Sequence, residues 1–497
     1  MSLEHFDTLI VGAGLSGIGS AVHLQQRCPG QRFAILEGRE RLGGTWDLFR
    51  YPGVRSDSDM HTLGYAFKPW TDGQSIADGP SILQYLQDTA REHGLLPHIR
   101  LGHRVVEAAW SSPQARWLLT VERGPAKERR QLSCSFLWVC TGYYNYAHGY
   151  TPDFPGLAQF KGRVVHPQDW PTNLDYRGQR VVVIGSGATA MTLVPAMAPD
   201  AARVTMLQRS PTYVLARARR DAVANALRQV LPQRLAYGLT RWKNVALGLL
   251  FYGLAKRRPE RVKARMVEAV AAALPKAFDV ATHFTPRYKP WDQRVCLVPD
   301  GDLFAAIQSG KAAVATDTVA AFEPQGIRLG SGAMLEADLV VTATGLDLLG
   351  FGGMAIRVDG QPLEIAKTMS YKGMMLAGVP NLAYVVGYTN ASWTLKSDLT
   401  GGFVCRLLRH MQRTGAVICR PRLPSSDVQA QPWVDFSSGY IQRSLDQFPV
   451  QGSSTPWRLN QNYLRDLLAL RFGTLQDGVL QFSKPPNLSD VAKPPPS

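Results

Sequence analysis

Residues 11–17 read VGAGLSG, and they directly follow an apolar run at residues 6–11. The apolar run predicts a buried strand, and the spacing of Gly12, Gly14 and Gly17 predicts a tight turn that opens a helix. In that order of elements, backbone amides and the helix N-terminus can meet a pyrophosphate. The stretch therefore predicts a dinucleotide-binding unit of the α/β class.

A second glycine loop, IGSGATA, repeats the pattern after another apolar run, which predicts a strand at residues 180–184, and its first glycine lies 173 residues beyond Gly12. One such loop is a weak signal by itself, but two in the same context are a strong one. The sequence therefore predicts two bound nucleotides. The residues expected to contact the second are Gly185, Gly187, Ala188 and Thr189.

The residue that follows each unit distinguishes the two nucleotides. Glu37 ends the strand predicted at residues 32–37, where a carboxylate accepts a hydrogen bond from a ribose hydroxyl. This predicts an unphosphorylated adenosine, as in FAD. At the matching point of the second unit stand Arg209 and Ser210, and a guanidinium can hold a ribose phosphate by two hydrogen bonds. The second unit therefore favours NADPH.

Composition indicates an enzyme of more than one lobe. The chain has 497 residues, is 45% hydrophobic and contains six cysteines without a CxxC pair. Disulfide reductases share a layout with two glycine loops but need such a dithiol, so this class is excluded. The cysteine pattern, the immediate start of the first strand and the absence of an apolar stretch of membrane-spanning length predict a cytoplasmic protein without a bound metal.

The net charge of +16 is concentrated in one region. Residues 217–265 contain thirteen Lys or Arg against two acidic residues, and they enclose an apolar run at residues 245–255. One interpretation is an inserted helical subdomain with a packed face and solvated charges. The other is a patch for peripheral membrane contact or self-association. Nucleic-acid binding is not favoured, because no recognised motif accompanies the charge.

The order of strands and helices predicts a doubly wound α/β fold in which one nucleotide domain interrupts the other. Further strands are expected at residues 117–122, 135–141, 203–207, 313–316, 337–344 and 382–387. The predicted divisions are an FAD domain at 1–145, a linker at 146–177, an NADPH domain at 178–340 with the basic helical insert at about 215–290, the second part of the FAD domain at 341–485, and a mobile tail at 486–497.

Residues 43–57, GGTWDLFRYPGVRSD, are predicted to lie beside the flavin ring. The glycines permit close backbone approach, and two aromatic residues offer flat faces. The contacts expected from this loop are Gly44, Thr45, Trp46, Tyr51 and Asp57. Taken alone, Asp57 would more often be a helix cap or turn residue.

Two longer patterns carry a family resemblance. The first, FxGxxxHxxxWP, is met by Phe160, Gly162, His166, Trp170 and Pro171. The second, GGxWxxxxYPGxxxD, is met by the loop that ends at Asp57. With both patterns complete, the chain resembles the type I Baeyer-Villiger monooxygenases, a group of class B flavoprotein monooxygenases. Segments such as LQRSPTY, VGYTNASWTLK and TPWRLNQNYLRD resemble the ethionamide-activating branch of this family.

The resemblance implies that NADPH reduces FAD, that O2 adds to give a peroxyflavin, and that this oxidant converts ketones to esters or lactones and also oxygenates sulfides and thioamides. It assigns the active-site arginine to Arg294, in PWDQR, and the acid that positions it to Asp57. It assigns His166 and Trp170 to the coupling of NADPH binding with domain movement. Without the family, Arg294 would be a surface ion-pair residue and His166 a structural one.

One position departs from the family, and two other functions stay open. Many members have Lys directly before the active-site arginine, where this chain has Gln293, so selectivity for NADPH over NADH is expected to be reduced. A flavin-containing monooxygenase acting on nitrogen or sulfur would use the same cofactors, but it lacks the ending Trp170 and Pro171. A non-catalytic sensor of FAD and NADPH is the alternative from another class.

Overall fold

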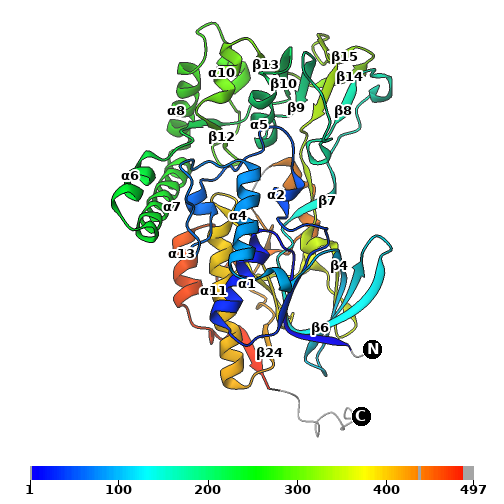
Figure 1. The fold of residues 1–497 in the computed structure, drawn as a ribbon, viewed down its shortest axis with the longest axis vertical. Helices are drawn as coiled ribbons and strands as arrows, with labels where there is room; N and C mark the ends of the chain where they lie inside the picture. Colours follow the sequence, from blue (N-terminus) through cyan, green and yellow to red (C-terminus); the bar gives the residue numbers. More distant parts are fainter. Residues whose placement is uncertain (1–2, 435–437, 485–497) are drawn as a thin grey trace.

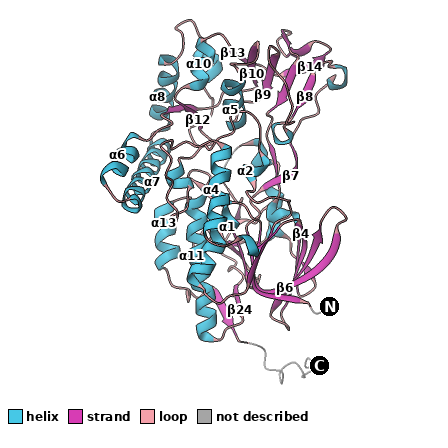
Figure 2. Ribbon diagram, viewed as in Figure 1, coloured by secondary structure: helices cyan, strands magenta, loops and turns pink. Residues whose placement is uncertain are grey.

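A computed structural model describes residues 3–434 and 438–484 of the chain, so the tail predicted at 486–497 lies outside the described residues. The molecule is elongated and has two lobes, each built on its own sheet (Figure 1). Both lobes mix helices and strands (Figure 2), as the predicted α/β class requires.

The first lobe contains the larger sheet, whose centre is parallel. β1 pairs in parallel with β2 and β6, so that Ile10 lies opposite both Ile35 and Trp138. Helices α1, α4 and α11 contribute buried side chains to the core on one face. Because the central strands are covered on both faces, their paired segments are mostly apolar, as in FAIL of β2 and FLWV at the end of β6. The sheet runs β20 (Gln361–Pro362), β19 (Ala355–Val358), β4 (His103–Ser111), β5 (Arg116–Arg123), β6 (Glu128–Val139), β1 (Glu4–Val11), β2 (Phe33–Leu36) and β3 (Ile99–Arg100), with β23 (Leu382–Tyr384) also on β6; the helices are α1 (Leu15–Arg27), α4 (Gly79–Glu92) and α11 (Trp393–Thr414).

The second lobe contains a five-stranded parallel sheet. Its order is β13 (Ala312–Thr316), β10 (Arg203–Gln208), β9 (Arg180–Ile184), β17 (Leu339–Thr342) and β8 (Arg163–Val165), and α5 (Ala188–Met197) and α10 (Asp302–Gln308) pack on it. β8 comes from the segment that the sequence analysis treats as a linker. The connection between the lobes is therefore hydrogen-bonded into the second sheet.

The basic region forms four helices, of which α6 and α7 project from the side of the molecule (Figure 1). They are α6 (Ala222–Val230), α7 (Gln233–Arg257), α8 (Pro259–Ala272) and α9 (Val280–Phe284). α7 lies against the first lobe, where the Tyr237 hydroxyl donates to the carbonyl of Tyr65 at 3.0 Å. Over the described ranges, none of the helices combines the length and the apolar character needed to cross a membrane.

The two lobes meet along the loop at residues 43–57. A Cβ on Gly53 would lie 2.6 Å from the Cβ of Ala196 in α5, so the loop is pressed against the second lobe. Arg55 of the same loop forms an ion pair with Asp302 at the start of α10. β7 (Tyr144–Gly149) and β18 (Leu346–Leu348), where the chain leaves and re-enters the first lobe, pair with each other. These contacts hold the loop between the two nucleotide units.

Most of the expected strands are present, with differences in their ends. β9 spans Arg180–Ile184 as predicted, whereas β6 begins at Glu128 rather than at residue 135. The strand β4 has no counterpart in the prediction. β4, β5 and the first part of β6 form an antiparallel ladder with exposed polar side chains, and this gives a weaker apolar signal than the parallel centre.

Candidate active site

The first glycine loop forms a close-fitting turn between β1 and α1. Gly12 has φ of +106°, and a Cβ there would lie 2.5 Å from the carbonyl oxygen of Cys140. Gly14 is the N-cap of α1 and has no side chain to cap the helix, while Gly44 approaches it closely enough that an added Cβ would be 3.0 Å from the Gly14 Cα. The unprotected amides of the first turn and the lack of side chains suit a pyrophosphate group.

Glu37 lies directly after β2, with both carboxylate oxygens engaged by backbone amides. The Ala13 N–H donates to Oε2 at 2.8 Å and the Arg39 N–H donates to Oε1 at 2.9 Å. Burial raises the pKa of Glu37, and these hydrogen bonds lower it by less. Each oxygen keeps a second lone pair for a ribose hydroxyl. The residues of this unit thus fit the adenosine end of FAD.

The second loop has the same geometry. Gly185 has φ of +133°, and a Cβ there would lie 2.3 Å from the carbonyl oxygen of Ala343. Gly187 is the N-cap of α5, which begins at Ala188. Arg209 and Ser210 are exposed just after β10, and the Ser186 hydroxyl donates to the Ser210 carbonyl at 3.2 Å. The exposed guanidinium therefore lies beside the loop, where the donor set suits a phosphorylated ribose.

Asp57 and Arg294 lie together where the lobes meet, although they are far apart in sequence. Arg294 Nη1 is 3.8 Å from Asp57 Oδ2. Asp57 ends the loop at residues 43–57, and Arg294 precedes β12 (Cys296–Pro299). Within the described residues, the Nε of Arg294 is buried and has no hydrogen-bond partner. A buried donor without a partner is costly, so this site is suited to a ligand that accepts a hydrogen bond.

The charges in this pair depend on burial and on nearby groups. Burial raises the pKa of Asp57, and Arg294 and Arg55 lower it by less. Burial alone would lower the pKa of Arg294, but the surrounding Tyr440, Tyr143 and Tyr144 hydroxyls and Asp57 keep it above its ordinary value. The guanidinium is therefore a permanent positive charge.

Three tyrosines lie next to Arg294, and none of them is among the site residues predicted from the sequence. Tyr143 and Tyr144 precede and begin β7, and their hydroxyls lie 3.3 Å apart. Tyr440 comes from α12 (Gly439–Gln442), close to the other end of the chain. Burial raises the pKa of Tyr440 to about 12, so its hydroxyl stays protonated. The segment CTGYYNY could have indicated the first two, but no local signal indicates Tyr440.

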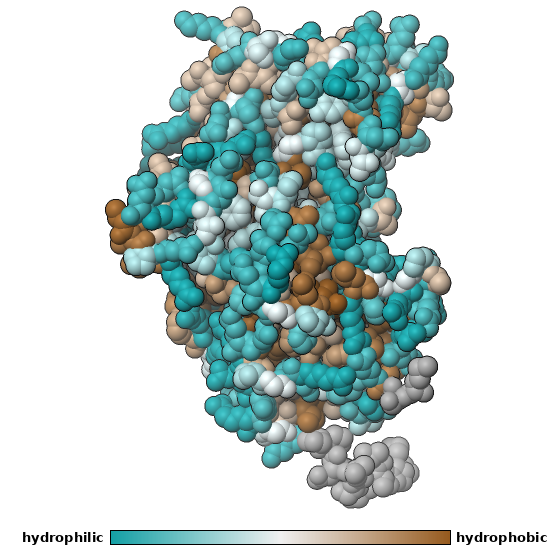
Figure 3. Space-filling view, in the orientation of Figure 1, coloured by the Kyte–Doolittle hydropathy of each residue, from teal (hydrophilic) through white to brown (hydrophobic). Residues whose placement is uncertain are grey.

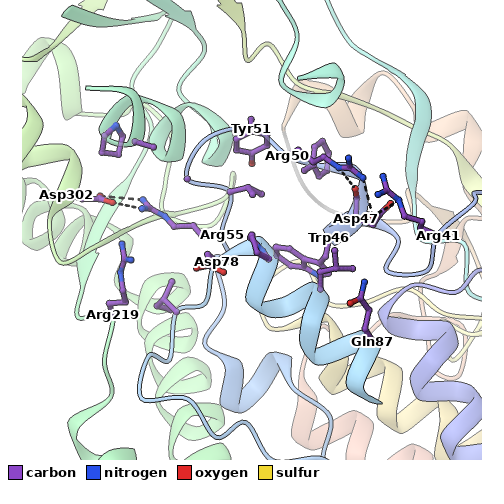
Figure 4. Close-up of a pocket in the computed structure, with 18 residues that line it drawn as sticks. Arg41, Trp46, Asp47, Arg50, Tyr51, Arg55, Asp78, Gln87, Arg219 and Asp302 are labelled. Carbon is purple, nitrogen blue, oxygen red and sulfur yellow. Dashed lines mark hydrogen bonds and ion pairs between the residues drawn. The ribbon is translucent and has the colours of Figure 1, made fainter. Parts of the chain in front are cut away.

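Within the loop at residues 43–57, the other predicted residues have different surroundings. Thr45 begins α2 (Thr45–Leu48) and shares a hydrogen bond of 3.1 Å with the Tyr146 hydroxyl. Trp46 and Tyr51 line a cavity of about 780 Å³ between α4 and the second lobe, in which Arg55 points to Asp302 (Figure 4). Asp57 and Arg294 are not among its lining residues. The residues predicted in this loop are therefore divided between the cavity and the arginine centre.

The residues of the pattern FxGxxxHxxxWP have structural contacts. Gly162 packs so tightly that a Cβ would lie 2.4 Å from the ring of Phe160. His166 Nδ1 accepts from the Gln168 N–H at 3.1 Å, which leaves Nε2–H to donate to the Gly345 carbonyl at 3.1 Å. Burial lowers the pKa of His166, so the ring is neutral near pH 7. Trp170 packs half-buried against the second core, and Pro171 follows it.

His166 thus joins the linker to the segment that returns to the first lobe. Gly345 has φ of +119° and directly follows Ala343 and Thr344, where β17 has ended. The location of His166 between the lobes is consistent with the coupling role that the family resemblance assigns to it. This role stays a prediction.

The glycine loop gives a direct prediction for FAD retention. Gly12→Ala is expected to lower the FAD content of the purified protein to below about one tenth, because the new Cβ meets a backbone carbonyl and the left-handed backbone is strained. Flavin absorbance per protein measures the content, and circular dichroism checks the fold. Gly73→Ala, where a Cβ meets nothing within 4 Å, is the control. Full FAD content in Gly12→Ala would contradict the assignment of this loop.

The fold and the paired loops define a protein with two dinucleotide-binding domains, and the comparisons identify its family. A model described as NAD(P)-binding Rossmann-like domain matches residues 10–72, and one described as flavin-binding monooxygenase-like matches residues 72–252. The FAD-containing monooxygenase EthA of Mycobacterium tuberculosis is 53% identical over 484 residues, which are 97% of this chain and 99% of EthA. This chain belongs to the FAD-containing monooxygenase family that includes EthA.

Solved structures share the fold at low sequence identity. A steroid monooxygenase bound to NADP aligns with a TM-score of 0.76 at 22% identity, over 97% of this chain and 100% of that one. A cyclohexanone monooxygenase bound to ε-caprolactone aligns with a TM-score of 0.75 at 19% identity, with the same coverage. The arrangement of two nucleotide-binding lobes is therefore the fold of these monooxygenases.

Proposed function

We propose that the protein is an NADPH- and FAD-dependent Baeyer-Villiger monooxygenase. It would insert one oxygen atom of O2 into ketones to give esters or lactones, and it would also oxygenate sulfides and thioamides. Three findings support this: the identity to EthA, the fold shared with a cyclohexanone monooxygenase that holds a lactone, and the meeting of Arg294 with Asp57 between the lobes. The observation that carries the proposal is the Arg294 guanidinium with its unpaired buried Nε.

The two glycine loops would hold the cofactors. Gly12, Gly14 and Gly17 with Glu37 fit the pyrophosphate and ribose of FAD. Thr45 lies close to this unit, because Gly44, the residue before it, packs against Gly14. Gly185 and Gly187 would receive the pyrophosphate of NADPH, and Arg209 and Ser210 would hold its ribose phosphate. Bound FAD supplies the transfer of electrons from NADPH to O2.

Arg294 would stabilise negative charge during the reaction. A fixed cation favours the deprotonated form of the attacking oxygen and lowers the energy of the charge that develops on the ketone oxygen. Asp57 would hold the guanidinium in place through the ion pair. The half-buried tyrosines around it would limit the access of water and lower the local dielectric constant, which would strengthen this electrostatic effect.

The deciding experiment follows labelled oxygen into product. The FAD-loaded enzyme is incubated with NADPH, ¹⁸O2 and a panel of aryl ketones, long aliphatic ketones and sulfides, and products are identified by mass spectrometry. We expect an ester or lactone that carries one ¹⁸O for each NADPH consumed. Sulfoxide formation without any ester would favour the flavin-containing monooxygenase acting on nitrogen or sulfur. NADPH consumption that yields only hydrogen peroxide, or no consumption, would contradict a monooxygenase and favour the sensor.

The location of the protein and its other partners stay proposals. All six cysteines are buried and free, and among the described residues no group of His, Cys, Asp or Glu could hold a metal ion. We propose a cytoplasmic enzyme whose partners are a small ketone or sulfide and O2, without nucleic acid.

A further inference from the structure

α7 exposes a stripe of apolar side chains although it is packed against the first lobe. Its inward face is mixed, because it buries Thr240, Arg241 and Asn244 together with Ala236, Tyr237, Val245 and Ala255. Its outward face exposes apolar side chains at helical spacing, among them Trp242 at 48% and Leu250 at 69%. The exposed apolar residues of α7 are Leu235, Leu239, Trp242, Leu247, Leu250 and Leu254. A soluble helix normally turns such a stripe to the core.

Arg241 and Asn244 on the inward face are bonded to the first lobe, and these bonds hold α7 in this orientation. The Arg241 guanidinium donates to the carbonyls of His61 at 2.9 Å and Gly64 at 2.7 Å, and it pairs with Asp398 at 3.3 Å. The Asn244 amide donates to Asp59 at 2.8 Å. Rotating the helix to bury its leucines would break all of these bonds and remove the Arg241 partner of Asp398. The apolar outward face is therefore a built feature of the fold.

The apolar surface continues from α7 onto its two neighbours. Val223 and Val230 of α6 are exposed, as are Leu464 of α13 (Tyr463–Leu467) and Leu468 and Phe472 of the following turn (Leu468–Phe472). The ring of Trp242 lies 6.0 Å from that of Tyr463, so α7 and α13 are in contact. We call these residues and the six of α7 the outer ridge. Hydrophobic side chains are visible at the edge where α6 and α7 project (Figure 3).

The charges around the outer ridge are almost all positive. Residues 222–259 contain seven Lys or Arg and no Asp or Glu. Arg234, Lys256, Arg257 and Arg258 are exposed at the two ends of α7. Arg465 and Arg471 are exposed beside Leu464 and Phe472, whereas Asp466 is buried and paired with Lys396. Glu260, at the start of α8, is the nearest exposed acid in sequence.

We propose that the outer ridge docks this enzyme on an anionic lipid bilayer. Leucine, tryptophan and phenylalanine side chains that project from convex helices can enter the interface of a fluid layer, and the flanking cations attract phosphate headgroups. A second copy of the chain would instead place these cations against the same cations, which is unfavourable. This inference does not depend on the reaction that the enzyme catalyses.

Vesicle binding tests the proposal with the full-length FAD-loaded protein. Co-sedimentation is measured with vesicles of phosphatidylcholine alone and with vesicles of equal parts phosphatidylcholine and phosphatidylglycerol. Binding is expected only to the anionic vesicles and should weaken with added salt. Leu239→Glu/Leu250→Glu should lower the partition coefficient at least tenfold. Arg257→Gln/Arg258→Gln should lower it about fivefold for each cation removed.

A matched control and a measurement without lipid separate the alternatives. Leu423→Glu changes an exposed leucine, at 71% exposure, that lies outside the outer ridge, and it should leave vesicle binding unchanged. Retained FAD absorbance in every variant shows that the fold is intact. Absence of wild-type binding, or an equal loss with Leu423→Glu, would overturn the proposal. A dimer in sedimentation velocity that Leu239→Glu/Leu250→Glu dissociates, without vesicle binding, would assign the ridge to a second copy instead.

Discussion

Arg294→Ala is expected to retain FAD and to oxidise NADPH, yet to form at least about 10²-fold to 10³-fold less ester from a ketone. The guanidinium lies beside Asp57 with a buried, unpaired Nε, so alanine removes this positive charge without touching either glycine loop. Electrons from NADPH should then leave as hydrogen peroxide. Ester and peroxide per NADPH consumed are measured by gas chromatography and a peroxidase assay.

Two variants control the Arg294 experiment. Arg294→Lys keeps the charge but loses the planar fork, so it should retain part of the activity. Arg287→Ala removes an exposed arginine from the same segment and should leave the ester yield unchanged. Full ketone turnover in Arg294→Ala would remove the catalytic assignment.

The second large effect concerns the choice of coenzyme. Arg209→Ala should lower kcat/KM for NADPH by about 10-fold to 150-fold, because a charged hydrogen bond to the ribose phosphate contributes roughly 1.5 to 3 kcal/mol. The effect on NADH should be small, since NADH lacks that phosphate. Steady-state rates with both coenzymes measure the difference.

Gln293 provides a complementary test of the same phosphate site. Gln293→Lys restores the cation that many family members have before the active-site arginine, and it should increase the preference for NADPH. An equal loss with both coenzymes in Arg209→Ala would place the phosphate site elsewhere on the protein.

The parts of the fold that sequence predicts well are those set by local rules. The turns at Gly12 and Gly185 require left-handed backbone and the absence of a Cβ, so their spacing alone indicates the strand, loop and helix. β9 is buried on both faces, and its continuous apolar run gave the correct ends. The antiparallel strand β4 was missed because only three of its nine residues are buried, which gives a weaker apolar pattern.

The parts that sequence could not predict depend on contacts between distant segments. Tyr440 reaches Arg294 only because the end of the chain folds back over the junction of the lobes. Arg55 forms an ion pair with Asp302 in the second lobe, and the spacing of residues within either segment does not indicate this pair. In the basic insert, the predicted packed face is present, but it holds Arg241 and Asn244 while leucines face outward. Sequence periodicity shows which residues share one face of a helix, whereas contacts with the rest of the protein decide which face is buried.

A crystal structure with FAD and NADP⁺ bound is the most direct test of the role proposed for Arg294. We expect its guanidinium to lie within hydrogen-bonding reach of the reactive edge of the flavin ring and of the nicotinamide, with Asp57 behind it. A guanidinium that points away from the flavin, with both nucleotides in their glycine loops, would confirm the cofactor sites and contradict the proposed chemistry.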